Sequence, residues 1–313
     1  MKLNVSVAIL TYGERKTFLY QVVDRLLIQD FNDIYVYSNG ISLVNLNELK
    51  DRYKDERVTI LYSKDNLGSA GGYHELLSYV TKNNNSEHIL LLDDDNLVPE
   101  NCYETIQSLD IEENQLYSFH RSDRLRAKLV KELKRPEDII GSSNSFLGRD
   151  IFSIFSAKSP VYQGDLAAAP YGGLLLNRKS LEVGALPKKE LYLYADDYEY
   201  THRLVTEYNF NIIFSEAVAI KDLEKSFHLK KGSRLLSNRY SNASVNQLYY
   251  SVRNNTWLGL TRCKSKALYS LNLWVYSMLF IIQCLLTFKF KTIKTFISAI
   301  KDGFSLYLSD KKE

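Results

Sequence analysis

Acidic residues gather at two places in the chain, and each group could bind a cation or accept a proton. Asp93-Asp94-Asp95 directly follows the apolar stretch Ile89–Leu92. Alternate carboxylates at a strand end can face one hard cation, and oxygen ligands favour Mg²⁺ or Mn²⁺ shared with substrate phosphates. A solvated acidic loop is the alternative interpretation. An EF-hand is excluded, because the residues after Asn96 lack the required glycine and glutamate.

The second acidic group is Asp196-Asp197, just before a predicted helix at about Tyr198–Tyr208. One of these carboxylates could serve as a general base. Capping of the helix N-terminus is the competing role, and aspartate performs it well. Both roles can coexist.

Glycines mark two further segments. In Asn66–Gly72 they would let backbone N–H groups approach a phosphate at a helix N-terminus. The pattern is neither a dinucleotide fingerprint, whose glycines follow the first strand, nor a Walker loop, which needs Gly-Lys-Ser/Thr. Gly172-Gly173 closes a segment of small residues. His228 is a lone histidine, which is more often structural than a ligand.

The elements that must position these residues alternate between strand-like and helix-like stretches. This spacing predicts βαβ units and a mostly parallel sheet, with ligands at the carboxyl ends of the strands. A basic helical stretch is expected at Arg121–Arg135. The other predicted strands are Asn4–Leu10, Ile34–Tyr37, Val58–Tyr62, Ile89–Leu92, Asp138–Ser142, Leu174–Leu176 and Ile212–Phe214, and the other predicted helices are Thr17–Leu27, Ser69–Thr81 and Asn246–Leu258.

Length and composition are those of a globular protein. The 313 residues suffice for one large α/β domain plus a modest second one. With 45% apolar and 25% charged residues, a disordered chain or a fibrous rod is excluded. Cys102, Cys263 and Cys284 are scattered, which argues against a disulfide scaffold and a cysteine–zinc site. The first residues lack a signal-peptide pattern, so we expect a cytoplasmic start.

Positive charge is concentrated near the C-terminus. Lys225–Lys301 contains thirteen Lys/Arg and no Asp or Glu, although the whole chain has a net charge of only +3. Such asymmetry predicts an acidic partner, either nucleic acid or an anionic membrane. The same segment encloses the uncharged run Ala267–Phe288, which favours an anionic membrane surface and argues against nucleic acid.

The uncharged run is 22 residues long, enough to span a bilayer. Basic residues at both ends conflict with the positive-inside rule for a single span. An in-plane or re-entrant helical pair at the cytoplasmic face of the cell membrane satisfies both ends, with a buried core or an oligomer interface as the alternative. An amphipathic helix with a basic polar face should follow; its apolar stripe comprises Ile293, Phe296, Ile297, Ile300 and Phe304.

Taken together, these motifs resemble the metal-dependent inverting glycosyltransferases of family 2 with the GT-A fold. The closest likeness is to the galactofuranosyl- and rhamnosyltransferase branch, over about residues 4–230. Tyr194-Ala195 departs from the pattern, because an aromatic residue often directly precedes the acidic pair. The matching positions are Thr11, Asn66–Gly72, Asp93, Asp95, Gly172-Gly173, Asp196-Asp197-Tyr198-Glu199 and His228.

This resemblance implies a fold and a set of residue roles. Residues 1–240 would form the GT-A domain, a Rossmann-like, mostly parallel sheet flanked by helices, with a nucleotide-sugar half (1–100) and an acceptor half (101–240). Residues 241–313 would form a helical membrane-associating region. The implied roles are Mn²⁺ or Mg²⁺ binding by Asp93, Asp95 and His228; catalysis by Asp197 and Asp196; donor binding by Thr11, Arg15, Asn39, Asn66, Gly68 and Asp94; and acceptor binding by Gly172, Gly173, Glu199 and Arg253.

The implied activity is inverting transfer of a sugar from a nucleotide donor. UDP-galactofuranose is the expected donor, and a lipid-linked glycan in cell-surface polysaccharide synthesis (O-antigen or capsule) is the expected acceptor. A rhamnosyl- or other hexosyltransferase is the first alternative. A nucleotidyl- or phosphotransferase would call for more basic residues than Lys64 and Arg15 near these motifs. A membrane-bound, non-catalytic scaffold is the remaining possibility.

Overall fold

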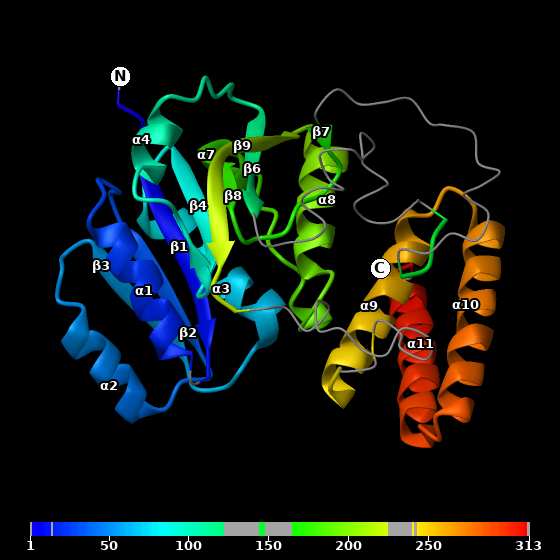
Figure 1. The fold of residues 1–313 in the computed structure, drawn as a ribbon. Helices are drawn as coiled ribbons and strands as arrows, with labels where there is room; N and C mark the ends of the chain where they lie inside the picture. Colours follow the sequence, from blue (N-terminus) through cyan, green and yellow to red (C-terminus); the bar gives the residue numbers. More distant parts are fainter. Residues whose placement is uncertain are drawn as a thin grey trace. The chain divides into compact units, whose positions relative to one another are not determined.

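The computed structural model describes residues 2–13, 15–121, 144–147, 165–224, 240 and 243–311 (Figure 1). His228, the predicted strand Asp138–Ser142 and most of the predicted basic helix lie outside these residues. The chain divides into two compact units. The first comprises residues 1–134, 163–192 and 196–224, and the second comprises residues 135–162, 193–195 and 225–313.

The first unit is built on one mixed sheet, whose described strands run in the order β3-β2-β1-β4-β8-β6-β9-β5. The first four, β3 (Val58–Ser63), β2 (Ile34–Asn39), β1 (Val5–Tyr12) and β4 (His88–Asp93), are parallel, as predicted. β8 (Leu174–Asn177) runs antiparallel to β4 and to β6 (Gln115–Arg121). β9 (Asn211–Asp222) is parallel to β6 and pairs antiparallel with β5 (Asn96–Leu97) and β7 (Asp165–Leu166).

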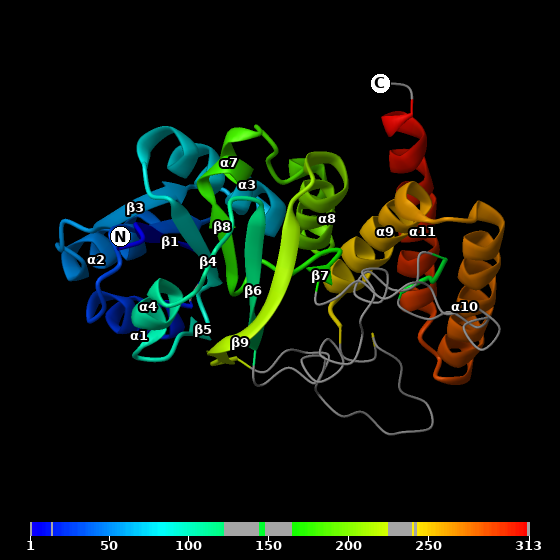
Figure 2. The same cartoon turned by 90° about the horizontal axis from the view of Figure 1, so that it is seen from above.

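Helices cover both faces of this sheet (Figure 2). α1 (Lys16–Leu27) and α4 (Cys102–Gln107) lie on one face, and α3 (Gly68–Asn83) and α7 (Arg178–Glu182) lie on the other. α8 (Asp196–Tyr208) packs beside α3. Alternate β1 residues face opposite layers, as the two-residue period of a strand requires. Val5, Val7 and Ile9 therefore join the α1 side chains in one buried core.

Several elements of the first unit escaped sequence-based prediction, among them α2 (Leu43–Arg52), α4 and β6. The basic helix predicted from Arg121 is wrong at its start, because Arg121 is the last residue of β6. Aromatic and polar residues alternate before it, as Tyr117-Ser118-Phe119-His120, which is a strand pattern. The run of positive charges that follows obscures that alternation.

Gly68 is the residue that allows α3 to begin where it does. Its φ is +70°, and an added Cβ would lie 1.9 Å from the Tyr192 carbonyl oxygen. The same carbonyl accepts a hydrogen bond from the Ala70 N–H at 3.1 Å. The loop after η1 (Lys189–Leu191) is therefore held against the start of α3 by contacts that leave no room for a side chain.

The second unit contains a helical region, as predicted: α9 (Val245–Arg262), α10 (Lys266–Leu286) and α11 (Phe290–Asp310). Phe280 and Phe296 stack at 4.3 Å and join α10 to α11. Gly303 lets α11 approach α9, because a Cβ there would lie 2.5 Å from the Arg253 carbonyl oxygen. Ile297, which belongs to the predicted apolar stripe of α11, is 52% exposed, and the buried residues of the helix are Phe296, Ala299 and Gly303.

We predict that Gly68→Ala destabilises the protein far more than Gly184→Ala. Both glycines have positive φ, which costs about 1–2 kcal/mol for another residue. An added Cβ at Gly184 would meet no atom within 4 Å, whereas one at Gly68 would meet a backbone carbonyl. Denaturant unfolding should show a loss of about 1 kcal/mol for Gly184→Ala and several kcal/mol for Gly68→Ala. Equal losses would show that the Tyr192 loop moves freely.

Candidate active site

Asp94 anchors the carboxyl ends of β1 and β4 to each other. One of its oxygens accepts a hydrogen bond from the Thr11 hydroxyl at 2.7 Å. The Arg15 Nε lies 2.8 and 2.9 Å from its two oxygens, and Arg15 also pairs with Asp95 and Glu224. Burial raises the pKa of Asp94 to about 6, although Arg15 and Thr11 oppose the shift. Thr11 and Arg15 are thus brought together with the acidic triplet, where they hold Asp94.

Asp93 and Asp95 lie in a second charged network centred on Arg121. Arg121 donates to Asp222 at 2.8 Å, and its Nη1 lies 3.7 Å from Asp93 Oδ2. The Tyr73 hydroxyl donates to Asp93 Oδ1 at 3.1 Å. Asp93 nevertheless keeps 39% of its side chain exposed, whereas Asp95 keeps 11%. Asp93 is therefore the carboxylate of the triplet most accessible to a ligand.

At Gly172 the main chain, which carries no side chain there, lies directly against the charged side chains around Arg121. An added Cβ would lie 2.2 Å from Asn96 Oδ1, 2.8 Å from Arg121 Nη1 and 2.9 Å from Asp93 Oδ2. Gly173 has a φ of +88° and packs against Ile220 and Phe119. Any side chain at position 172 would displace the groups that surround Asp93.

The charge balance of this cluster suits a divalent cation. Within the described residues, five carboxylates face the two cations Arg15 and Arg121, which leaves three negative charges when all are ionised; the carboxylates are those of Asp93, Asp94, Asp95, Asp222 and Glu224. Burial, followed by the charges of Asp93, Asp222 and Asp94, raises the pKa of Asp95 to about 7.

The described residues contain no group of three His, Cys, Asp or Glu side chains that could hold a metal by itself. Asp93 and Asp95 offer hard oxygen ligands of the kind that Mg²⁺ and Mn²⁺ prefer, so the residues present fit such an ion as part of its shell. Further ligands would have to come from His228, which lies outside the described residues, or from substrate phosphates.

Asp196 and Asp197 lie at the start of α8 in different surroundings. Asp196 is buried; its Oδ1 accepts a hydrogen bond from the Ser69 hydroxyl at 3.0 Å, and its Oδ2 has no hydrogen-bond partner among the described residues. Burial and the neighbouring Asp197 raise its pKa well above the usual range. Asp197 is only partly buried. Burial raises the pKa of Asp197 to about 6. The Tyr198 N–H, which donates a hydrogen bond to Asp197 Oδ1 at 2.8 Å, opposes this shift, and the negative charge of Asp93 adds to it.

Asn39 fastens the glycine turn to the end of β2. Its Nδ2 donates to the Gly68 carbonyl oxygen at 2.9 Å and to Asn66 Oδ1 at 3.2 Å. Its Oδ1 accepts from the Leu67 N–H at 2.8 Å and from the Ser63 hydroxyl at 3.1 Å. Asn39, Asn66 and Gly68 are therefore brought together, with Asn39 buried beneath the turn and Asn66 exposed.

Two predicted acceptor residues are engaged by neighbouring side chains of their own units. Glu199 is buried, and both its oxygens accept hydrogen bonds from Arg203 at 3.0 Å, one helical turn later. Arg253 belongs to α9 in the second unit, where it donates to Asn254 and its guanidinium lies 4.9 Å from the Tyr250 ring centroid.

Sequence reasoning missed several residues of the site. Arg121 and Asp222 end their strands, β6 and β9, and polar residues at strand ends were the available signal. Tyr73 and Ser69 lie on the first turns of α3, directly after the glycine motif. Tyr12, 50% exposed at the end of β1 with its ring 5.1 Å from the Arg15 guanidinium, is a further candidate for contact with a planar ligand.

The fold of the chain matches that of solved GT-A glycosyltransferases. Residues 6–149, a little under half of the chain, match the family model described as glycosyl transferase family 2. No curated protein matches the sequence. The comparisons leave the galactofuranosyl and rhamnosyl branch undecided.

Three solved structures share the fold at low identity. The mannosyltransferase PcManGT from Pyrobaculum calidifontis, in complex with GDP-Man and Mn²⁺, is 11% identical, with a TM-score of 0.53 over 97% of this chain and 76% of that chain. S. aureus TarS 1-349 is 14% identical, with a TM-score of 0.52 over 96% of this chain and 80% of that chain. GalNAc-T7 with UDP, GalNAc and Mn²⁺ is 13% identical, with a TM-score of 0.51 over 80% of this chain but only 47% of that chain.

We predict that Asp196→Asn changes the pH dependence of stability. The folded-state pKa of Asp196 is raised, so the native protein binds this proton more tightly than the unfolded chain does. The free energy of unfolding then falls as pH rises from about 4 through the folded pKa. Asparagine has no such proton, so the stability of the variant relative to wild type should grow between pH 5 and pH 8.

Thermal melts at both pH values measure this difference. Asp30→Asn is the control without pH dependence in this window, because Lys2 lowers the pKa of that exposed carboxyl, which is then ionised in both the folded and the unfolded chain above pH 5. A difference between Asp196→Asn and wild type that stays constant with pH would contradict the burial argument.

Proposed function

We propose that this protein is a metal-dependent inverting glycosyltransferase in which Asp197 is the general base. The observation that carries the proposal is the proximity of two carboxylates with different environments: Asp93 is the more exposed ligand candidate, and its charge helps to raise the pKa of Asp197 to about 6. A base with a pKa near neutrality is ionised at working pH yet basic enough to accept a proton.

The residues divide the chemistry between donor and acceptor. Asp93 and Asp95, with His228, would hold Mn²⁺ or Mg²⁺, which when bound neutralises the diphosphate leaving group. Asp197 accepts the proton of an acceptor hydroxyl while that oxygen bonds to the anomeric carbon. The bond from this carbon to the diphosphate oxygen breaks on the opposite face, so the configuration inverts. Asp196, held by Ser69, would fix the start of α8 next to the base.

The donor side is supported by the strand ends of the parallel half of the sheet. The ends of the first two strands, with Thr11, Arg15 and the exposed Tyr12, would face the nucleotide. The turn held by Asn39, which includes Asn66 and Gly68, would lie along the ribose-diphosphate. We propose UDP-galactofuranose as the donor, from the likeness of the glycine turn and the acidic motifs to that branch, with rhamnosyl or other hexosyl transfer as the alternative.

The acceptor side would be formed by Gly172 and Gly173, with Glu199 supporting α8 through Arg203. We propose a lipid-linked glycan as the acceptor, with the enzyme at the cytoplasmic face of the cell membrane. The second unit supports this, because α10 is long and apolar enough to cross a membrane, the one such helix among the described residues. Arg253 remains a proposed contact for the lipid diphosphate.

We predict that Asp197→Asn abolishes transfer while donor binding persists. The variant keeps nearly the same shape but loses basicity, so turnover should fall by roughly 10²–10⁴. Calorimetry with UDP should give unchanged affinity. Glu199→Gln is the matched control, because it alters a carboxylate on the same helix that pairs with Arg203. Full activity in Asp197→Asn would refute the assigned base.

We predict that Asp93→Ala and Asp95→Ala remove metal-dependent turnover without unfolding the chain. EDTA should likewise abolish the transferase activity of the wild-type enzyme. The excess of negative charge at these residues is relieved by either substitution, so stability should not fall sharply. Mass spectrometry of products from a panel of nucleotide sugars and lipid-linked acceptors provides the assay. Activity that survives EDTA would contradict the metal role, and no product from any donor would favour the non-catalytic scaffold.

A further inference from the structure

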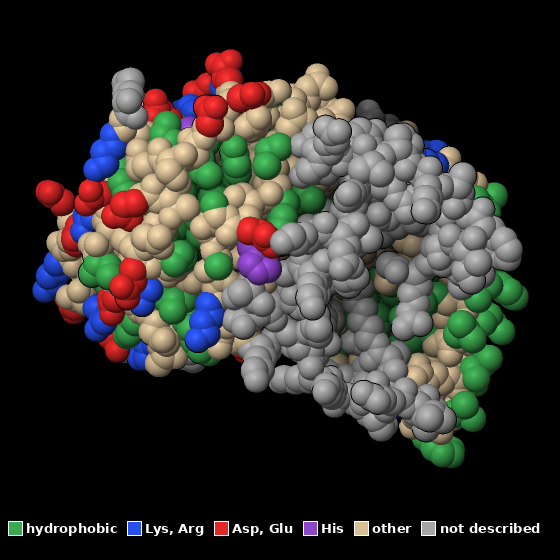
Figure 3. Space-filling model, turned by 45° about the horizontal axis from the view of Figure 1, so that its top comes forward, with side chains coloured by type: hydrophobic (Ala, Val, Ile, Leu, Met, Phe, Trp, Pro, Cys, Tyr) green, Lys and Arg blue, Asp and Glu red, His purple; other side chains and the backbone are tan. Residues whose placement is uncertain are grey.

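One side of α10 is apolar and exposed along its whole length. Figure 3 shows hydrophobic side chains gathered along the outer edge of this helix. The exposed residues recur at spacings of three and four, so they share one helical face. They are Leu268, Leu271, Trp274, Met278, Leu279, Ile282, Leu285 and Leu286, and the exposed Phe288 and Phe290 continue the face beyond the helix.

The opposite side of α10 packs against other residues of the second unit. The Tyr269 hydroxyl donates to the carbonyl oxygen of Asn255 on α9 at 3.1 Å, and Asn272 donates to that of Asn144 at 2.8 Å. Phe280 and Cys284 are buried in the same core. A helix that crosses a bilayer alone would expose these polar side chains to lipid, which is costly. The packing therefore favours α10 lying flat.

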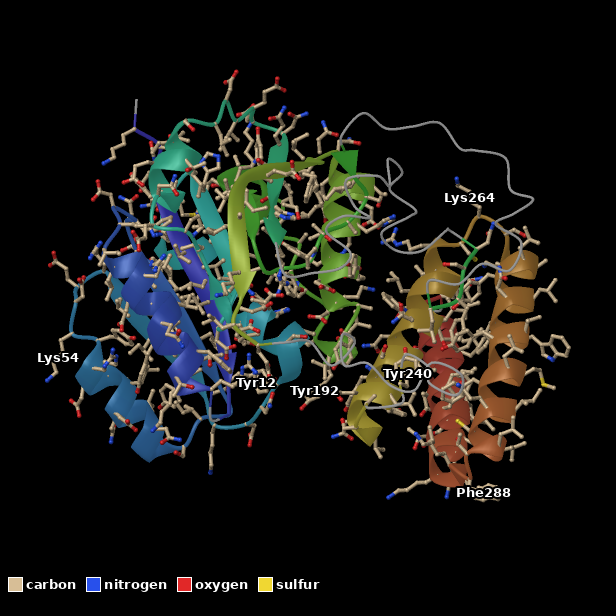
Figure 4. All side chains as sticks on the ribbon, in the orientation of Figure 1. Tyr12, Lys54, Tyr192, Tyr240, Lys264 and Phe288 are labelled. Atoms are coloured by element: carbon tan, nitrogen blue, oxygen red, sulfur yellow. The ribbon has the colours of Figure 1, made fainter. Side chains whose placement is uncertain are left out.

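Positive charge flanks the apolar face at both ends. Figure 4 labels Lys264 before α10 and Phe288 after it. Lys264 and Lys266 are exposed at the first end, and Lys289 and Lys291 at the second. Within the described part of α9–α11, acidic residues appear only from Asp302 onward. Basic ends on a flat apolar face match a bilayer with anionic headgroups.

A hollow of about 360 Å³ continues the face at its second end. Its lining combines apolar residues with cationic ones, including Leu248, Phe288, Phe290, Lys289 and Lys291. This combination suits the upper acyl chain and charged headgroup of one phospholipid. The interaction partner that the surface fits best is therefore lipid.

We propose that the outer face of α10 inserts in the plane of an anionic bilayer, with Lys264, Lys266, Lys289 and Lys291 at headgroup level. This deepens the membrane location given under the proposed function, but it depends only on the second unit. Vesicle binding without donor or acceptor therefore tests it separately from catalysis. If binding is observed and transfer is not, the catalytic proposal alone fails.

Tryptophan fluorescence of the full chain reports the depth of insertion. Trp274 is 60% exposed on the apolar face, whereas Trp257 is buried and donates to Asp310 at 2.8 Å. Phosphatidylglycerol vesicles should shift the Trp274 emission to the blue, and Trp274→Phe should abolish the shift. Bromine near the headgroup end of the acyl chains should quench more than bromine near the methyl end, because an in-plane helix lies about 5–10 Å into the boundary.

Flotation with the same vesicles tests the named residues. Leu279→Glu should lower binding more than 10-fold, while Ile28→Glu, an equally exposed apolar position in the first unit, should leave it unchanged. Lys289→Gln and Lys291→Gln should each lower binding about fivefold at low salt. Circular dichroism checks that each variant folds.

Three outcomes would overturn the proposal. Strongest quenching from the methyl end of the lipid would show that α10 spans the bilayer. Absence of binding to anionic vesicles at low salt would exclude a membrane surface. A stable dimer in light scattering that Leu279→Glu dissociates, together with no vesicle binding, would show that a second copy covers the face.

Discussion

The site depends on the packing of four aspartates around two arginines at the carboxyl end of β4. Arg15 joins Asp94 and Asp95 to the end of β1, and Arg121 joins Asp93 to Asp222 at the end of β9. These ion pairs hold together strands that are distant in sequence. They leave an excess of negative charge, and burial raises the pKa of Asp94 to about 6 and of Asp95 to about 7. A cation from solution would complete the cluster.

Close backbone approach is the second constraint on the site. Gly172 brings main chain against Asp93 and Arg121, and Gly68 allows α3 to start beside the Tyr192 loop. Asn39 then fixes the turn before α3 through four hydrogen bonds. These contacts place the proposed donor-binding turn and the acidic pair of α8 on elements whose positions are set by the sheet.

The parallel half of the fold could be predicted from sequence, because buried strands and one-sided helices leave strong periodic patterns at β1, β2, β4 and α3. The antiparallel neighbour β8 could not be oriented, since its four residues carry no directional signal. The acidic motifs were recognisable by their place at element ends. Arg121 and Asp222 also end strands, but that position alone does not reveal their role, because each acquires it from a partner about a hundred residues away.

Binding of Mn²⁺ to the wild-type protein in the presence of UDP tests the proposed metal site most directly. Calorimetry near pH 6.5 in buffers of different ionisation enthalpy would measure both affinity and proton release. We predict one ion bound with release of protons, because a cation beside Asp95 lowers a pKa that burial has raised to about 7. Asp93→Asn should weaken this binding. Tight UDP binding with no bound Mn²⁺ and no proton release would contradict a metal site at these carboxylates.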